Sequence, residues 1–280
     1  ATSNISILVD GTYGPLVEIN SNVLVNNENQ VLSYAAIGVN YASNISIASN
    51  QIEGFSRGIT VLNAYNSQIT QNDIVNSGSI GVYFRELPGP IPTSSYITCN
   101  SIKMKTYRST GIYVERMDKH GEISSNCVAD CGTSIFLRDG STLPKIRNNY
   151  LYNYTNAGVD IRDYTGDIGT GTADPGMNTF WSNDNSAFDI YSSPGTVSVY
   201  DNFGMFNLSL ATVSVISSNP AHSTASCGHQ IYESPSQGNL NTDYSCDNKT
   251  QFAVGMERTS LGVVLSPNYT YEVQGHPAPF

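Results

Sequence analysis

One short phrase recurs along most of the chain: an aliphatic residue, two intervening residues, Asn, one further residue and an apolar residue. Clear copies span Ile47–Ile52, Ile69–Ile74, Ile97–Ile102, Ile123–Val128 and Ile146–Leu151, with weaker copies near Asn178 and Asn202 and an earlier one expected at Val23–Asn26. From Asn50 to Asn202, successive Asn residues lie 22 to 29 residues apart. Repetition at this period indicates a solenoid, because one unit cannot bury its apolar face alone and neighbouring units have to stack.

A second phrase, Gly-apolar-x-apolar, follows each Asn by 8 to 11 residues. Its copies begin at Gly58, Gly81, Gly111, Ser134, Gly158 and Ala187. The alternation predicts short strands whose apolar side chains face a shared interior. We place the recurrent Asn at a corner between strands, where it tolerates the left-handed αL conformation and its amide can bond to the neighbouring coil.

Together the two phrases resemble the repeat of the pectate-lyase-like and NosD-like proteins, over roughly residues 20–204. The resemblance implies an all-β fold, a right-handed parallel β-helix. It does not select an activity, since that superfamily includes polysaccharide lyases, glycoside hydrolases, epimerases, tailspikes, adhesins and copper-loading factors. We therefore expect coils over 1–204. A further strand or two is expected near Leu208–Val215, within a C-terminal cap or flanking β segment over 205–280, because the open end of a β-helix invites edge pairing.

Composition supports a strand-rich, polar surface. Charged residues make up 13% of the chain, against about 25% in an average soluble domain. The net charge of −10 disfavours a nucleic acid or an anionic membrane as partner. No apolar run reaches the length that spans a bilayer, so we expect no transmembrane segment.

Cysteines and glycosylation sequons bear on the compartment. Five cysteines leave at least one thiol free or paired between chains, and Cys227 with Cys246 is the best candidate for a disulfide. Asn-x-Ser/Thr sequons, which permit glycosylation, occur at Asn4, Asn44, Asn153, Asn207, Asn248 and Asn268. We expect a protein that is secreted, extracellular or attached to the cell surface.

Charged and aromatic residues gather at the outward positions around the second phrase. Aligned on the Gly, the second residue after it runs Thr60, Tyr83, Tyr113, Phe136, Asp160, Asp189; the fourth runs Leu62, Arg85, Glu115, Arg138, Arg162, Tyr191; and the fifth runs Asn63, Glu86, Arg116, Asp139, Asp163, Ser192. Four of the chain's eight arginines fall here. Such residues on neighbouring strands can simply pair, at about 0.2–1 kcal/mol each. They can also form a glycan groove of aromatic platforms and Arg forks.

The groove interpretation assigns roles to named residues. Substrate binding falls to Tyr83, Arg85, Tyr113, Arg116, Phe136, Lys119 and His120, and catalysis to Glu115, Arg138, Asp139, Arg162 and Asp163. In a uronate lyase, Arg138 or Arg162 would neutralise the substrate carboxylate, and Lys119, Tyr113 or His120 would be the base. A hydrolase would need two of the carboxylates. A calcium ion would need an acidic cluster drawn from Glu115, Asp139, Asp160 and Asp163. Long loops at Leu87–Ser94 and Tyr164–Pro175 would wall the site.

Two functions therefore stay open. One is a secreted β-helix that binds a polysaccharide and, as a lyase or glycosidase, also cleaves it. The other is a non-enzymatic structural or adhesive protein such as a fibre, filament or tailspike-like subunit, for which a homo-oligomer is expected. The absence of an Asp-Pro-His motif (Asp174-Pro175 is followed by Gly) and of an ordered polygalacturonase motif set weakens the enzymatic branch. Mutual pairing of Arg138, Arg162, Glu115 and Asp139 on an open face would weaken it further, whereas convergence in a cleft would favour it.

Overall fold

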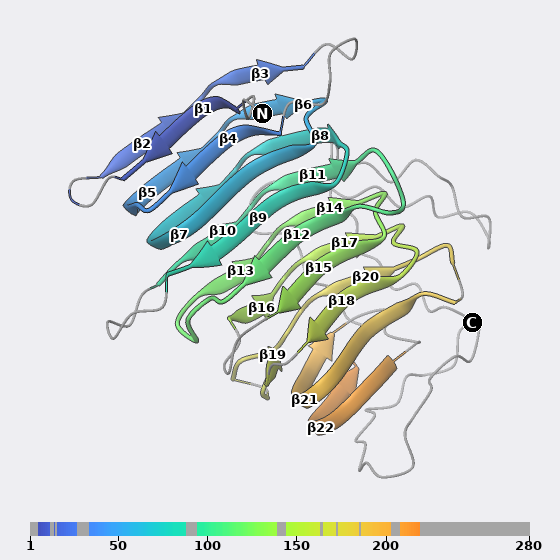
Figure 1. Ribbon diagram of the computed structural model, residues 1–280. Helices are drawn as coiled ribbons and strands as arrows, with labels where there is room; N and C mark the ends of the chain where they lie inside the picture. The colour runs from blue at the N-terminus through green and yellow to red at the C-terminus, as the bar shows by residue number, and fades with distance from the viewer. Residues whose placement is uncertain are drawn as a thin grey trace.

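The chain forms a stack of parallel strands that advances from the N-terminus to the C-terminus (Figure 1). A computed structural model describes residues 5–11, 14, 16–26, 34–87, 94–138, 144–162, 165–171, 173–184, 186–202 and 208–218. Within these ranges the regular elements are all strands, and the strand pairings are parallel. The predicted all-β parallel β-helix is confirmed.

Each coil contributes strands to three faces. The first face comprises β1 (Ile5–Asp10), β4 (Ala35–Asn40), the start of β7 (Arg57–Thr70), β9 (Ile80–Glu86), β12 (Thr110–Glu115), β15 (Thr133–Arg138), β18 (Ala157–Arg162) and the start of β21 (Phe188–Asn202). The second comprises β2 (Val17–Asn20), β5 (Ser43–Ala48), the end of β7, β10 (Tyr96–Thr98), β13 (Glu122–Ser124), β16 (Lys145–Arg147), β19 (Gly166–Ile168) and the end of β21. Because β7 and β21 run across both faces, these fourteen strands, together with β22 (Leu208–Ser218), form one 15-stranded sheet.

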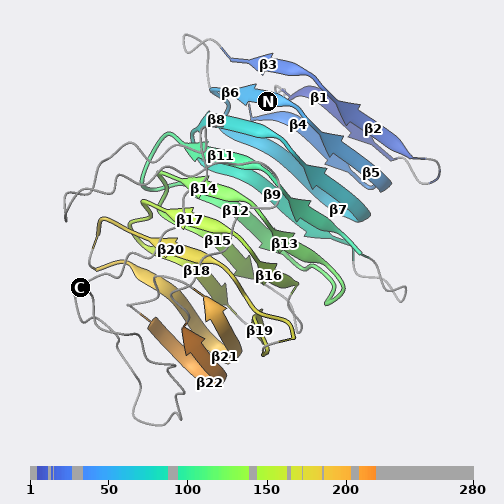
Figure 2. The same ribbon diagram turned by 180° about the vertical axis from the view of Figure 1, so that it is seen from behind.

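The third face is a separate 7-stranded sheet, seen behind the first sheet in Figure 1 and from the other side in Figure 2. Its strands are β3 (Val23–Val25), β6 (Gln51–Glu53), β8 (Asp73–Ser77), β11 (Ser101–Met104), β14 (Cys127–Ala129), β17 (Tyr150–Tyr152) and β20 (Thr179–Trp181). The further strand expected near Leu208 is β22 (Leu208–Ser218), which stacks on β21.

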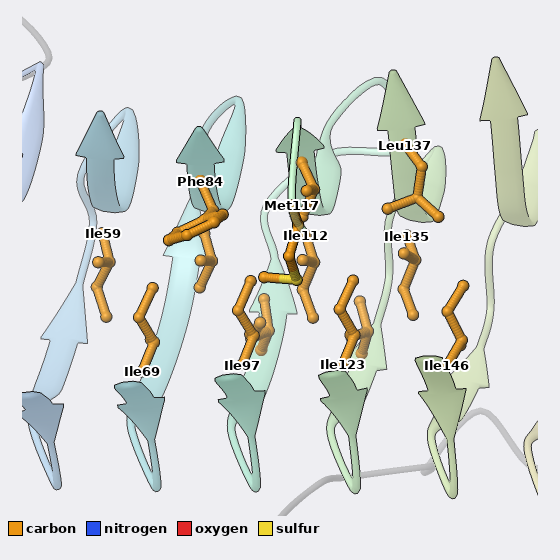
Figure 3. Close-up of a cluster of buried hydrophobic side chains, with 14 of the residues drawn as sticks. Ile59, Ile69, Phe84, Ile97, Ile112, Met117, Ile123, Ile135, Leu137 and Ile146 are labelled. Atoms are coloured by element: carbon orange, nitrogen blue, oxygen red, sulfur yellow. The ribbon is translucent and has the colours of Figure 1, made fainter. Parts of the chain in front are cut away.

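The core consists of identical or similar side chains stacked in register between the faces. Ile69, Ile97, Ile123 and Ile146 form one such column on the second face, each fully buried. Figure 3 shows them facing Ile59, Ile112 and Ile135 of the first face, with Phe84, Met117 and Leu137 completing the layer. Parallel strands lie about 4.8 Å apart, so a repeated residue meets its own copy one coil away.

The recurrent Asn residues form a continuous buried ladder at the corner between the second and third faces. The Asn50 Nδ2 donates to Asn72 Oδ1 at 2.9 Å and to the Ile19 carbonyl, and the same Oδ1 accepts the Asn50 backbone N–H. The arrangement repeats at every step to Asn202. Each interior amide therefore uses both donors and both lone pairs, as buried polar groups require.

Two details of the predicted corner are wrong. The ladder begins at Asn22, which donates to Asn50 Oδ1 at 2.9 Å, and not at Asn26. The left-handed residue is the one before the Asn, with φ between 54° and 59° at Ser21, Ser49, Gln71, Cys99, Ser125, Asn148 and Met177. That preceding residue turns the backbone and leaves the Asn itself free to aim its amide along the stack.

The glycines of the second phrase are required by close packing. A Cβ on Gly111 would lie 2.1 Å from Val128 Cγ1 and 2.8 Å from the Ser134 carbonyl oxygen. A Cβ on Gly58, Gly81 or Gly158 would lie 2.5 to 2.7 Å from its nearest neighbouring atom, which is also too close. The first face therefore packs its strand starts directly against the side chains of the third face.

The predicted alignment of the last coil is wrong by two residues. Val159 pairs with Ile190 and Asp160 with Tyr191, so Asp189 occupies the glycine position of that coil. Asp189 is fully buried and accepts a hydrogen bond from the Tyr154 hydroxyl. Ser192, which the sequence alignment placed outward, is buried as well. Phe188 pairs with Ala157, and Tyr191 pairs with Asp160. Tyr191, and not Asp189, is therefore the outward residue of this coil.

Candidate functional site

An outward row of residues crosses the first face in register. We call Thr60, Tyr83, Tyr113, Phe136, Asp160 and Tyr191 the outer row. Tyr83 and Tyr113 meet edge to face with ring centroids 5.0 Å apart, and Tyr113 stacks on Phe136 at the same distance with planes 24° apart. The three rings therefore form one aromatic surface across β9, β12 and β15.

A charged row lies beside the aromatic surface, two residues further along each strand. It contains Leu62, Arg85, Glu115 and Arg138 in register. Glu115 is its centre: Tyr83 donates its hydroxyl to Oε2 and Tyr113 donates to Oε1, each at 2.9 Å. Arg85 Nη1 lies 3.9 Å from the same Oε2, while its Nη2 donates to Asn63 Oδ1 at 3.1 Å.

These contacts change the acidity of the two phenols. Burial and, after it, the hydrogen bond to Glu115 and the negative charge of that carboxylate raise the pKa of Tyr83 to about 12. The same causes raise the pKa of Tyr113, against which Arg138 acts in the opposite direction. Both phenols are therefore neutral donors at physiological pH, which makes Tyr113 a poor candidate for the base that the lyase interpretation assigned to it.

At the C-terminal side of the outer row, Arg162 and Asp160 form a bidentate pair. Arg162 Nε and Nη2 donate to the two Asp160 oxygens at 2.6 Å and 3.0 Å. The Arg162 guanidinium lies over the Tyr191 ring, 4.2 Å from its centroid. At the N-terminal side, Arg57 lies 4.5 Å from the Tyr34 centroid and 5.1 Å from that of Tyr83, a feature that the sequence analysis missed. Arginine therefore stacks on an aromatic ring at both ends of the surface.

The other predicted site residues lie around this surface or outside the described residues. Arg116 is exposed and has a φ of 56° after β12, and Lys119 and His120 are exposed in the following turn. Glu86 is buried and accepts hydrogen bonds from Ser95 Oγ and the Asp118 N–H, so it belongs to the turn and not to the surface. Asp139 and Asp163 lie outside the described residues, as does most of the Leu87–Ser94 loop.

A second ionic cluster, on the second face, was not foreseen. Arg147 Nε and Nη2 each lie 3.0 Å from an Asp174 oxygen, Nη2 also pairs with Asp167 at 2.5 Å, and Lys145 Nζ lies 2.8 Å from Asp174. Hydrogen bonds from Arg147 hold the pKa of Asp174 well below its usual range, with Lys145 acting in the same sense against burial. This cluster fixes the chain after β19 against β16. Asp174, the first residue of the Asp174-Pro175 pair, therefore has a structural role as the partner of Arg147 and Lys145.

The cysteine and sequon predictions are tested only where residues are described. Cys131 is a free, buried thiol, and burial raises its pKa to about 12. Cys227 and Cys246 lie outside the described residues, as do the sequons at Asn4, Asn207, Asn248 and Asn268. The amides of Asn44 and Asn153 donate to the Gly14 carbonyl and to Asp130 Oδ1 respectively. Attachment of a glycan at either residue would have to displace or adapt these bonds.

Two features, a metal-binding cluster and a membrane-spanning helix, are not found among the described residues. Across the described ranges, no group of three or more His, Cys, Asp and Glu side chains gathers closely enough to hold a metal ion. The carboxylates proposed for calcium are occupied where described, Glu115 by two phenols and Asp160 by Arg162. No helix in the same part of the chain is long and apolar enough to cross a membrane.

Comparison with known proteins gives the family. No curated protein and no solved structure shows significant similarity to the chain. A family model described as the right-handed β-helix region matches residues 35–204, which is more than half of the chain and spans most of the coils described above. The parallel pairing, the three-faced coils and this match agree, and the chain belongs to the right-handed β-helix family.

Proposed function

We propose that this protein is an extracellular polysaccharide-binding β-helix that holds an acidic glycan across the first face. The observation that carries the proposal is the aromatic surface of Tyr83, Tyr113 and Phe136, in register on adjacent strands and bordered by guanidinium groups. Aromatic faces pack against the apolar faces of sugar rings, and Arg forks bind carboxylate or sulfate groups with two hydrogen bonds each. A strand-to-strand spacing of about 4.8 Å offers an extended polymer a regular set of contacts.

Local charge favours an acidic ligand. The chain carries a net charge of −10, yet four arginines lie beside this surface, at Arg57, Arg85, Arg138 and Arg162. The acidic groups within it are already satisfied: Glu115 by the two tyrosines and Asp160 by Arg162. Within the charged row, Arg138 is exposed whereas Arg85 is half-buried, so Arg138 is the more accessible guanidinium for a ligand.

The same contacts favour binding over cleavage. A glycosidase needs one carboxyl group as acid and another as base or nucleophile. Both oxygens of Glu115 accept hydrogen bonds from phenols, and both oxygens of Asp160 accept hydrogen bonds from Arg162. A lyase needs a base beside its neutralising arginine, and Tyr113 is held protonated by burial and by Glu115. The proposal is therefore a glycan-binding surface without hydrolase or lyase chemistry.

Binding is tested on a panel of acidic and neutral polysaccharides, by calorimetry at two salt concentrations. We expect acidic polymers to bind, more weakly at high salt. Combined Arg85→Ala and Arg138→Ala should weaken binding by about tenfold or more, because a hydrogen bond to a charged group contributes about 1.5–3 kcal/mol. Lys103→Ala combined with Arg108→Ala is the matched control, since it removes two positive charges at exposed residues outside the first face.

Two results would overturn the proposal. Equal loss of binding in the control variant would mean that net charge, not this surface, binds the polymer. Release of unsaturated uronate ends or new reducing ends by the parent protein, lost on Glu115→Gln, would show cleavage instead of binding alone.

The non-enzymatic alternative, a fibre or filament subunit, has one specific observation in its favour. Large apolar residues are exposed on the first coil and the segment after it, with Leu8 61% and Val23 67% exposed, and Leu16 and Val25 more than half exposed. Among the described strands, β1 pairs with β4 alone, so its other edge offers unpaired backbone groups. A homo-oligomer through this end predicts a molecular mass that rises with concentration in sedimentation experiments, and a concentration-independent monomer would contradict it.

A further inference from the structure

The outer side of the third face changes character along the stack. On β6 and β11 its outward residues include the exposed Gln51, Glu53 and Lys103. On the three coils that follow β11, the strands β14, β17 and β20 carry Cys127, Ala129, Tyr150, Tyr152 and Trp181 at the corresponding positions. We call these five residues the outer apolar patch. Their neighbours Val128, Leu151 and Phe180 point into the core, so the patch faces away from it.

The patch is buried although it lies on the outside. Its five residues are 0 to 7% exposed and form a cluster distinct from the core. Small outward residues such as Thr60 and Asp160 are buried by larger neighbours, but the rings of Tyr150, Tyr152 and Trp181 lose their exposure only when atoms beyond the sheet cover them. In contrast, Glu53 and Lys103 on the preceding coils are exposed, as expected for an uncovered face. Something therefore lies over the third face at β14, β17 and β20.

The described strands do not supply that cover. The close contacts of β14, β17 and β20 are with one another, with β11, and with β12 and β21 of the other sheet. The described turn at 105–109 contacts the corner of the stack, at Asn153 and Thr155. Of the short stretches outside the described residues, 139–143 and 163–164 connect first-face strands to second-face strands, and 203–207 joins the end of β21 to the start of β22, beyond β20.

We propose that residues 219–280 bind along the outer apolar patch, as a flank on the side of the β-helix. This inference is independent of the glycan-binding proposal, because the patch and the aromatic surface belong to different sheets. The segment begins directly after β22, at the same end of the stack as β20. The distance from β22 to β14 along the stack is about 20 Å, at about 4.8 Å per coil. About six extended residues can span that distance.

The sequence of this segment suits such a role. Residues 261–265, Leu-Gly-Val-Val-Leu, form a short apolar run with Leu261, Val263 and Leu265 at alternate positions, as in a strand that packs one side on an apolar surface. The apolar side of residues 261–265 would be buried against the outer apolar patch, and the patch would be covered by the same contact. Covering also protects a row of tyrosine and tryptophan side chains that would otherwise invite association.

The experiment uses the full-length chain, in which Trp181 is the single tryptophan. Its fluorescence therefore reports on the patch alone. We expect a blue-shifted emission and weak quenching by acrylamide in the parent protein. Leu261→Asp combined with Val263→Asp should raise the quenching constant several-fold, whereas the matched control, Ser260→Asp with Ser266→Asp, should leave it unchanged at the same added charge.

A second measurement separates the segment from the patch. A protease site inserted after Asn219 allows the folded chain to be nicked, and we expect the two pieces to stay associated in size-exclusion chromatography with Trp181 still protected. The proposal is overturned if the pieces separate while Trp181 stays protected. It is also overturned if the aspartate variants quench like their control, or if protection falls on dilution, which would assign the cover to a second copy of the chain.

Discussion

The Asn ladder allows one substitution to be worked through in detail, Asn100→Ala. Asn100 is fully buried in the middle of the ladder. Its Nδ2 donates to Asn126 Oδ1 and to the Ile69 carbonyl, each at 2.9 Å, and its Oδ1 accepts the Asn72 N–H at 3.0 Å and the Asn72 Nδ2 at 2.9 Å. Its Nδ2 also donates to the Thr98 carbonyl at 3.1 Å, so alanine removes five bonds at once.

The cost does not equal five full hydrogen bonds, because some partners keep other bonds. Asn72 Nδ2 still donates to the Ile47 and Thr70 carbonyls, and Asn126 Oδ1 still accepts the backbone N–H of residue 100. The Asn72 N–H loses the acceptor that Asn100 Oδ1 provides, and the Ile69 and Thr98 carbonyls each lose a donor. A buried group left without its partner costs about 1–3 kcal/mol, so the free energy of unfolding should drop by about 4 kcal/mol in total. This is a large part of the 5–15 kcal/mol that stabilises a typical protein.

Urea unfolding followed by far-UV circular dichroism measures the loss, with the slope of the transition checked for constancy. Two controls bracket it. Asn156→Ala removes one hydrogen bond at an exposed site, to Thr133 Oγ1, and should cost less than about 1 kcal/mol. Asn22→Ala, at the first position of the ladder, should fall in between. If Asn100→Ala costs no more than Asn156→Ala, the ladder does not stabilise the stack and the reasoning is refuted.

Three further predictions concern the glycines, the phenols and the second ionic cluster. Gly111→Ala should destabilise by about 1–3 kcal/mol or more, because its Cβ would lie 2.1 Å from Val128 Cγ1, while Gly78→Ala, whose Cβ would meet nothing closer than 3.7 Å, should be neutral in the same urea assay. The pKa of Tyr83, raised from 10.0 to about 12, predicts that stability falls as pH rises through this interval, since the unfolded chain releases the proton first; Tyr83→Phe should reduce the fall, and an unchanged profile would contradict it. Asp174→Asn should lower the urea midpoint at neutral pH, and its difference from the parent should vanish as pH falls below the usual carboxyl range, because the depressed pKa of Asp174 contributes stability only above it; a difference that is constant with pH would exclude the ion pairs as its source.

The fold was predictable because stacking repeats one physical requirement in every coil. The Asn phrase and the Gly phrase each mark a contact with the next coil, an amide ladder in one case and a close approach such as Gly111 to Val128 in the other. The register of Tyr83, Tyr113 and Phe136 followed from the same alignment. In the last coil the alignment failed, because Asp189 replaces the glycine and the sequence offers Ala187 two residues earlier as a substitute.

Other features were not predictable because they depend on side-chain conformation or on chain that folds back. The sequence places Glu115 on the first face but does not reveal that two phenols point at its oxygens. The contact of Arg147 with Asp174 depends on the path of the residues between β19 and β20. The outer apolar patch did leave a signal. Cys127–Ala129 and Tyr150–Tyr152 are apolar at consecutive positions, and such runs are typical of strands covered on both sides.

The amide-to-amide bonds of the ladder all run the same way along the stack, since each Asn Nδ2 donates to the Asn Oδ1 of the next coil toward the C-terminus. Every interior coil therefore presents an amide donor to the coil on its C-terminal side and an amide acceptor to the coil on its N-terminal side. Whole coils are interchangeable units in this scheme, and the length of the first face can grow or shrink in steps of one coil without a new joint. A partial coil has no such freedom, because it would move an Asn away from the buried corner and leave the neighbouring amide donor and acceptor without partners.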